Sequence, residues 1–158
     1  MGVEKVVADY RDLAVMLKRH TDAGRSVALT NGCFDLLHVG HVRLLEAAAE
    51  EADVLVVALN TDESVRGNKG PSRPLVPLAE RMEVLAALEC VDHVTSFPEP
   101  TADNLLETLR PNVYCKGTDW AADQVPERAT AEKIHARIAI CGDQKSHSSS
   151  ELAERLGR

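Results

Sequence analysis

The sequence predicts an α/β fold in which a five-stranded parallel sheet is flanked by helices. Short apolar runs alternate with amphipathic segments along the chain, and glycine and polar residues separate them. Residues 53–59 (DVLVVAL) are apolar from Val54 onward. Strands that alternate with helices form parallel sheets covered on both faces. A continuously apolar strand belongs in the middle of such a sheet. The 158 residues suffice for one domain, which we expect to span residues 1–158.

The first half of the chain predicts two helices and two strands. Apolar residues recur at helical spacing over residues 9–22, and Gly24 ends that segment. The run SVALT (26–30) follows the glycine and predicts a buried strand. A second helical pattern covers residues 42–52 and leads into the apolar strand 53–59. The order helix, strand, helix, strand is the repeating unit of a doubly wound sheet.

The second half begins with a long polar segment. Residues 60–77 (NTDESVRGNKGPSRPLVP) are rich in glycine and proline, which predicts a loop. Because loops of this length are usually functional or mobile, we expect it to be mobile until substrate binds. The remaining expected elements are a helix over 78–88, a strand over 91–97, a helix over 102–110, a strand over 112–117, a helix over 127–136, a strand over 137–142 and a helix over 149–156.

Composition and charge limit the function. Hydrophobic residues make up 44% of the chain, as in globular proteins, and the formal net charge is −7. The negative charge argues against a nucleic-acid partner but allows a small anionic substrate, which needs only a few local cations. The four cysteines are far apart, so they form no zinc or redox pattern, and a reducing cytoplasm fits best. No apolar run is long enough to span a membrane.

The segment TNGCFDLLHVGH (30–41) carries the clearest functional pattern. It lies at the carboxyl end of the first predicted strand, where ligands bind in open parallel sheets. Gly32 can adopt backbone angles closed to other residues, and Gly40 lets a ligand approach the start of the next helix. The free N–H groups and positive dipole end of a helix favour phosphate. His38 and His41 could donate hydrogen bonds to phosphate oxygens there and stabilise charge that grows during phosphoryl transfer.

Other readings of the histidine pair remain open from the residues alone. Two histidines at a helix start can be helix caps or a chance pairing. A zinc site is weaker, because metalloprotease histidines are four residues apart with a glutamate between them. The neighbours of His38 and His41 are leucine, valine and glycine, which supply no third ligand. We therefore predict no protein-held metal.

The segment resembles the His-x-Gly-His signature of the nucleotidyltransferase superfamily, and NGCFDLLHVGH resembles its sugar-phosphate and cytidylyltransferase branch. Three further segments resemble bacterial D-glycero-D-manno-heptose 1-phosphate adenylyltransferases. They are NKGPSRPLVPLAER (68–81), CKGTDW (115–120) and HSSSEL (147–152), which stands at the family's Ser-Thr-Thr motif. The resemblance runs in order from about residue 9 to the C-terminus. It implies a Rossmann-like nucleotidyltransferase fold.

The resemblance also implies the reaction and its residues. AMP would pass from ATP to D-glycero-D-manno-heptose 1-phosphate, giving ADP-heptose and pyrophosphate. The catalytic residues it implies are His38, His41 and Lys69. The nucleotide-binding residues it implies are Asn31, Gly32, Cys33, Phe34, His38, His41, Lys116, Gly117, Asp119, Ser148, Ser149 and Ser150. The acceptor-binding residues it implies are Asp35, Asn60, Lys69, Arg73 and Arg81.

Several of these residues also have structural interpretations. Arg81 could simply face water from its helix, and Lys116 with Asp119 could form a surface ion pair of little value. Ser148 is a good helix N-cap, with Glu151 placed to complete a capping box. Glu151 also departs from the family, in which Asn or Arg is frequent, and a carboxylate beside a triphosphate would repel it.

Two other functions remain open. A cytidylyltransferase for glycerol 3-phosphate or a similar alcohol phosphate is disfavoured, because GDQK stands where that family carries Arg-Thr-Glu-Gly. A non-catalytic nucleotide-binding module is disfavoured by the intact His38, His41 and Lys69. The resemblance implies Mg²⁺ with ATP, held mostly by phosphate and water. Many relatives carry a fused sugar kinase domain. Here we expect a separate kinase, and a homodimer remains open.

Overall fold

The computed structural model describes residues 2–144 and 148–157. The strands form one parallel sheet in the order β1-β4-β3-β2-β5-β6. The predicted α/β architecture is confirmed, but the predicted number of five strands is wrong, because six are present. The strands are β1 (Val6–Asp9), β2 (Val27–Gly32), β3 (Val54–Asn60), β4 (His93–Phe97), β5 (Val113–Gly117) and β6 (Arg137–Cys141).

The strand missed in the sequence is β1, at the edge of the sheet. It is four residues long and half-exposed, so it has neither the length nor the apolar run of the inner strands. Its pairing with β4 is limited to Val6 opposite Val94 and Asp9 opposite Ser96. Such a short strand forms only because β4 offers it a partner.

The helices connect the strands and cover the sheet. None of the described helices is long and apolar enough to cross a membrane. Short 3₁₀ turns lie at Val3–Lys5 and Ala122–Gln124. The α-helices are α1 (Tyr10–Asp22), α2 (Val39–Glu50), α3 (Asp62–Lys69), α4 (Leu78–Ala86), α5 (Asp103–Leu109), α6 (Arg128–Lys133) and α7 (Ser149–Arg155).

Helix α3 corrects the prediction of an unbroken loop over residues 60–77. It begins after Thr61, whose side chain accepts the N–H of Ser64 at 3.3 Å. Two acidic residues in its first turn, Asp62 and Glu63, stabilise the helix because their negative charges lie near the positive end of the helix dipole. The helix buries only Ser64 and Val65, so its sequence lacks the apolar stripe that marks longer helices. The expected mobility of residues 60–77 stays a prediction.

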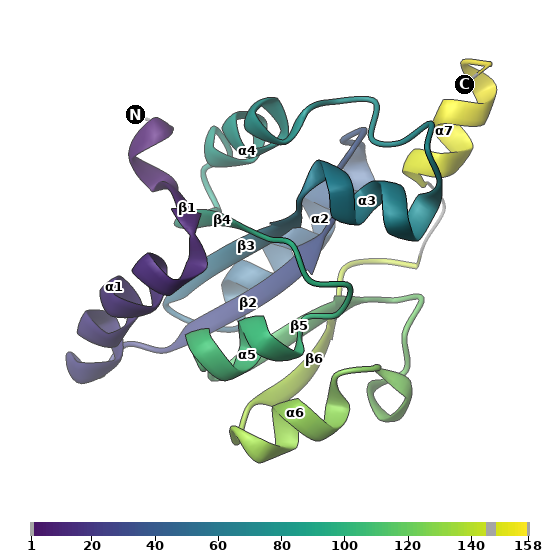
Figure 1. Cartoon of the computed structure of the whole chain (residues 1–158). Coiled ribbons are helices and arrows are strands. Elements are labelled where there is room, and N and C mark those ends of the chain that lie inside the picture. The colour runs from purple at the N-terminus through teal and green to yellow at the C-terminus, as the bar shows by residue number, and fades with distance from the viewer. Residues whose placement is uncertain (1, 145–147, 158) are drawn as a thin grey trace.

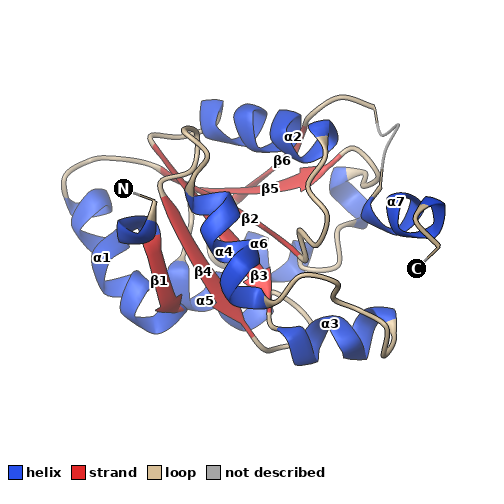
Figure 2. Ribbon diagram, turned by 90° about the horizontal axis from the view of Figure 1, so that it is seen from above, coloured by secondary structure: helices blue, strands red, loops and turns tan. Residues whose placement is uncertain are grey.

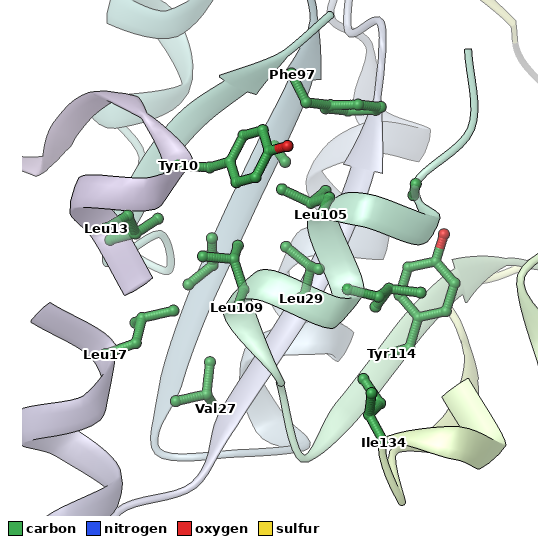
Figure 3. Close-up of a cluster of buried hydrophobic side chains, with 14 of the residues drawn as sticks. Tyr10, Leu13, Leu17, Val27, Leu29, Phe97, Leu105, Leu109, Tyr114 and Ile134 are labelled. Carbon is green, nitrogen blue, oxygen red and sulfur yellow. The ribbon is translucent and has the colours of Figure 1, made fainter. Parts of the chain in front are cut away.

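Alternate residues of the strands face two separate cores. On β3, Val54, Val56 and Ala58 face the core under α1, α5 and α6, and the residues between them face the core under α2 and α4. Figure 1 shows α2 behind the sheet and α5 in front of it. Figure 3 shows the first core, where Leu13 and Leu17 of α1 approach side chains of the sheet and of α5. Both faces of the sheet are therefore covered.

The strand order reverses between β2 and β5. The chain runs from β2 outward through β3 to β4 and then returns to β5 on the other side of β2. Figure 2 shows the consequence from above, with α2 on the opposite side of the sheet from α1 and α5. A reversal of this kind leaves a crevice outside the carboxyl ends of the two strands, which is where ligands bind in such sheets.

Candidate active site

A pocket of about 260 Å³ opens at this reversal. The carboxyl ends of β2, β5 and β6 form its floor, and the start of α2 and the serines of α7 form its walls. The lining residues are Thr30, Asn31, Gly32, Cys33, Phe34, His38, Gly40, His41, Leu44, Lys69, Lys116, Gly117, Thr118, Asp119, Trp120, Cys141, Gly142, Asp143, Ser148, Ser149 and Ser150.

The pocket brings together most of the residues predicted from the sequence. Every predicted nucleotide-binding residue lines it, and so does Lys69 from the end of α3. The predicted acceptor-binding residues Asp35, Asn60, Arg73 and Arg81 are not among its lining residues. Most of the predicted acceptor residues therefore lie behind the lining, where Asn60 and Arg81 contact Cys33, and their role in acceptor binding stays a prediction.

The two histidines cap the helix on which they lie. His38 is the N-cap of α2, and its Nδ1 accepts the N–H of Gly40 at 3.1 Å. In return, Nδ1 of His41 accepts the N–H of His38 at 3.3 Å. The pair satisfies two N–H groups at the helix start, as a Ser and a Glu do in an ordinary capping box. The cap interpretation is thus confirmed, and both rings line the pocket as well.

The caps determine the tautomer of each imidazole. A neutral ring whose Nδ1 accepts a hydrogen bond carries its proton on Nε2. His38 and His41 both accept at Nδ1, so both have Nε2–H as their donor. The rings are stacked, with centroids 3.9 Å apart and planes 26° apart. The start of α2 therefore carries two stacked imidazoles, each with an Nε2–H, beside its own positive dipole end.

Gly40 is required by the stacked rings. A Cβ at this position would lie 2.9 Å from Cε1 and 3.0 Å from Nδ1 of His38. Contacts this short are not tolerated, so any side chain would displace the cap. Gly40 also lines the pocket, and its predicted role of letting a ligand approach the helix start stays a prediction.

The strained residue of the segment is Phe34. Its backbone φ is +49°, in the left-handed region, which residues other than Gly and Asn rarely adopt. Gly32, for which unusual angles were predicted, does not lie in the left-handed region, but a Cβ there would lie 3.1 Å from the Phe34 ring. Phe34 is buried, and its ring centroid is 5.2 Å from that of His41. Strain of this kind persists where packing over-determines it, which is typical of functional sites.

Lys116 supplies a cation at the floor of the pocket. Its Nζ lies 5.6 Å from the centroid of the Tyr114 ring and 5.4 Å from that of the Trp120 ring. Burial lowers the pKa of its ammonium, and the carboxylates of Glu127 and Asp119 partly offset that effect. A surface ion pair is therefore not the right description of Lys116, because the residue is half-buried and its ammonium lies beside two aromatic rings.

The lowered pKa of Lys116 predicts pH-dependent nucleotide binding. A lowered pKa means that Lys116 loses its proton at a lower pH than an exposed lysine, whose pKa is about 10.4. A bound phosphate raises this pKa again, so binding should take up protons, increasingly as the pH rises, and affinity should fall over the same range. Calorimetry of ATP binding in two buffers of different ionisation enthalpy measures this uptake. Lys116→Arg should abolish the uptake, and equal uptake in both proteins would contradict the prediction.

Arg81 lies in a buried network beside the pocket and does not face water. Its side chain is fully buried, with a relative exposure of 2% for the residue. The guanidinium donates to the carbonyl oxygen of Cys33, directly after β2, at 2.7 Å and to that of Asn60, the last residue of β3, at 3.0 Å. It also donates to the Val76 carbonyl at 2.9 Å and to the carboxylate of Asp62 at 2.6 Å. Arg81 therefore ties α3, α4 and two strand ends together.

Asp35 performs a similar task for the segment before α4. Its carboxylate accepts the backbone N–H groups of residues 75 and 76 at 2.9–3.0 Å. It also pairs with Arg73 at 3.3 Å, and both side chains are largely buried. Asn60 donates to the hydroxyl of Ser64 at 3.0 Å. Asp35, Asn60 and Arg73 therefore have protein partners outside the pocket lining.

The serine motif joins α7 to the histidine segment. Ser148 caps α7 by accepting the N–H of Glu151 at 3.0 Å, as predicted. Ser149 donates from Oγ to the carbonyl of Leu36 at 2.8 Å. Residues 145–147, which include the first residue of HSSSEL, lie outside the described residues.

Several pocket residues were not singled out in the sequence. Trp120 directly follows Asp119 and is 37% exposed at the pocket. Gly142 and Asp143 follow β6 and belong to the segment GDQK, which was compared with relatives but given no residue in the predicted site. Asp143 pairs with Arg43 of α2 at 2.6 Å. The rule that ligands bind at the carboxyl ends of parallel strands could have assigned Gly142 and Asp143 to the site. The other lining residues not singled out are Thr30, Leu44, Thr118 and Cys141.

A family profile and similar curated proteins match the same region of the chain. The profile of the Cytidylyltransferase-like family matches residues 29–155. The bifunctional protein HldE of Geobacter sulfurreducens is 43% identical over 144 residues, which are 91% of this chain and 29% of that protein. The bifunctional protein HldE of Alcanivorax borkumensis is 38% identical over 155 residues, 98% of this chain and 33% of that protein. The chain thus spans about a third of the length of these relatives.

Solved structures support the fold. The lipopolysaccharide core biosynthesis protein from Thermoplasma volcanium superposes with a TM-score of 0.68 at 22% identity, over 77% of this chain and all of that one. Pantoate-beta-alanine ligase from Francisella tularensis superposes with a TM-score of 0.61 at 15% identity, over 96% of this chain and 77% of that one. At these identities the likeness concerns the fold alone.

Proposed function

Because the chain belongs to the cytidylyltransferase-like family of nucleotidyltransferases, we propose that it transfers AMP from ATP to D-glycero-D-manno-heptose 1-phosphate. The products are ADP-heptose and pyrophosphate. The observation that carries the proposal is the pair of imidazole donors at the start of α2, which share one pocket with Lys69 and Lys116. The relatives named HldE, at 38–44% identity, support the heptose substrate.

The proposed reaction is a direct displacement. An oxygen of the acceptor phosphate attacks the α-phosphorus of ATP, the bond from that phosphorus to the bridging oxygen breaks, and pyrophosphate leaves with the electron pair. Such chemistry needs no protein nucleophile, only positioning and charge stabilisation. His38 and His41 donate from Nε2 to the phosphates, with His41 stabilising the transition state. Lys69 and Lys116 add positive charge on other sides of the pocket.

The acceptor is proposed to bind on the Lys69 side of the pocket. Lys69 ends α3, and it is the member of the predicted acceptor set that lines the pocket. Arg81 and Asp35 contribute indirectly, because their contacts hold α3 and the segment before α4 in place. Arg73 is paired with Asp35 and would have to leave it to reach an acceptor phosphate.

Magnesium is proposed to accompany the triphosphate. Within the described residues, no three His, Cys, Asp or Glu side chains come together to hold a metal ion. The pocket carboxylates are those of Asp119 and Asp143, which suits an ion held mainly by phosphate oxygens and water. When bound, such an ion neutralises charge on the phosphates.

The working conditions are a further proposal. Four free thiols suit a reducing compartment, so we propose that the protein works in the cytoplasm. The proposed reaction transfers AMP to a phosphate that the sugar already carries. A separate kinase is therefore proposed to phosphorylate the sugar first. A homodimer remains a proposal.

The test is a matrix of ATP, CTP, GTP and UTP against several sugar and alcohol phosphates, with pyrophosphate as the readout. We expect turnover with ATP and D-glycero-D-manno-heptose 1-phosphate. Turnover with glycerol 3-phosphate and CTP would favour an alcohol-phosphate cytidylyltransferase. Nucleotide binding with no pyrophosphate from any pair would indicate a non-catalytic binding module.

Within that matrix we expect ATP to be preferred over CTP. The phosphates are common to both nucleotides, so the preference must come from the groups around the base. Trp120 offers an exposed aromatic face at the pocket, and a purine has more surface to stack than a pyrimidine. Size alone discriminates by about 10–200-fold, and unpaired buried polar groups would add to that. Competition between the two nucleotides for one sugar phosphate measures the ratio, and a preference for CTP would remove the main support for the heptose substrate.

A further inference from the structure

A buried hydroxyl in the core under α1, α5 and α6 contacts a residue that lines the pocket. Tyr114 lies on β5 directly opposite Leu29 of β2, and both side chains belong to the core under α1, α5 and α6. Figure 3 shows the Tyr114 ring among these apolar side chains, with its hydroxyl pointing away from Ile134. Tyr114 has no exposed surface, so the pocket does not contact its ring.

The hydroxyl of Tyr114 is bonded to a pocket residue. Side chains two residues apart on a strand share a face, so Asn31 lies on the same face as Leu29, one step nearer the carboxyl end. Tyr114 Oη donates to Asn31 Oδ1 at 2.6 Å. Asn31 is half-buried and lines the pocket. The bond therefore links the core to the nucleotide site through one amide.

This bond sets the direction of the amide. An Asn side chain has one acceptor end and one donor end. Because Oδ1 accepts from Tyr114, Nδ2 is the end left for the pocket. Burial raises the pKa of Tyr114, and the nearby Glu127 carboxylate raises it further through its charge and as a second hydrogen-bond acceptor, so the hydroxyl stays protonated. The short 2.6 Å bond identifies Asn31 Oδ1 as the acceptor that the hydroxyl faces directly.

We propose that Tyr114 is a positioning residue for the nucleotide, which turns Nδ2 of Asn31 toward the ligand so that it donates to a nucleotide oxygen. The inference rests on the proposed function, because it takes the pocket to hold a nucleotide. Lys116 at the same floor makes that region suited to oxygen-rich, negatively charged groups. Without the hydroxyl, the amide can present either end and loses part of its binding.

The test compares two Tyr→Phe variants for ATP binding in the absence of acceptor. Tyr114→Phe should raise the Kd by about 3- to 10-fold, the value of one oriented hydrogen bond. Tyr10→Phe is the matched control, because Tyr10 lies in the same core and donates to Glu99 at the same 2.6 Å, away from the pocket. It should lower stability similarly and leave the Kd within about 2-fold. Equal Kd values for the two variants would overturn the proposal.

Two further variants show whether Tyr114 acts through Asn31. In an Asn31→Ala background, Tyr114→Phe should cause no further rise in Kd, whereas a general structural role would persist. Asn31→Asp should weaken ATP binding more than Asn31→Ala, because it places a carboxylate where a donor is needed. Binding of Asn31→Asp as tight as wild type would overturn the assigned direction of the amide. If wild type binds no nucleotide, the proposed function fails. If wild type binds and turns over while these variants behave alike, only the inference fails.

Discussion

Replacing His41 by Ala should lower kcat by about 10²–10³-fold while the protein stays folded. The side chain has two tasks, because its Nδ1 caps the N–H of His38 and its Nε2–H is the proposed donor to the transferred phosphate. Losing the cap costs about 1 kcal/mol of stability, which is a small part of the total. Losing the donor removes charge stabilisation in the transition state. Initial rates with saturating ATP and acceptor, together with a thermal melt, measure both effects.

Two controls sharpen this test. His41→Gln keeps an N–H donor near the position of Nε2 and should recover part of the rate. His20→Ala removes a histidine from α1, which lies outside the pocket, and should leave kcat unchanged. Unchanged turnover in His41→Ala would contradict the proposed role. An unfolded His41→Ala protein would show that the cap is its main contribution.

Replacing Arg81 by Met should lower the free energy of unfolding by about 3 kcal/mol or more. The substitution keeps the length and apolar character of the stem but removes every donor. The carbonyl oxygens of Cys33 and Asn60 then lose a buried partner, and Asp62 loses its counter-charge. The cost comes mainly from the carbonyl oxygens, which stay desolvated without a donor, whereas the Asp62 side chain is 35% exposed and can be hydrated. Urea unfolding followed by circular dichroism measures the loss.

Arg128→Met is the matched control for Arg81. Arg128 pairs with Glu132 one helical turn away, and both side chains are more than half exposed. Its loss should change stability by no more than about 0.5 kcal/mol. Similar stabilities for the Arg81 and Arg128 variants would show that the buried network contributes little.

The fold was predictable where apolar patterns are long, and less so elsewhere. The inner strands β2 and β3 are buried along most or all of their length and could be located from their apolar residues alone. Strand β1 has only four residues with no alternation, and only its pairing with β4 makes it a strand. Helix α3 is mostly polar, yet its start was visible in Thr61 and the acidic residues after it. The glycine and proline residues that follow predict a loop, and that pattern hides the capping signals of the short helix.

The site residues also differ in how far they could be predicted from the sequence. His38 and His41 are close in sequence, so their joint position at a helix start could be predicted. The partners of Arg81 are backbone carbonyl groups up to 48 residues away, and nothing in the local pattern of α4 indicates them. Arginine on a helix is usually solvated, so its burial depends on tertiary contacts alone. The bond from Tyr114 to Asn31 spans 83 residues and was equally invisible.

The edge position of β1 has a consequence for attempts to shorten the protein. The region shared with the cytidylyltransferase-like family begins at residue 29, after β1 and α1 and inside β2. A chain cut there would lose the partner of β4, whose free backbone N–H and C=O groups would then form a template for strands of other molecules. It would also uncover the apolar surface that Leu13 and Leu17 now bury. The first 28 residues therefore protect the sheet against aggregation, although they contribute no residue to the pocket lining.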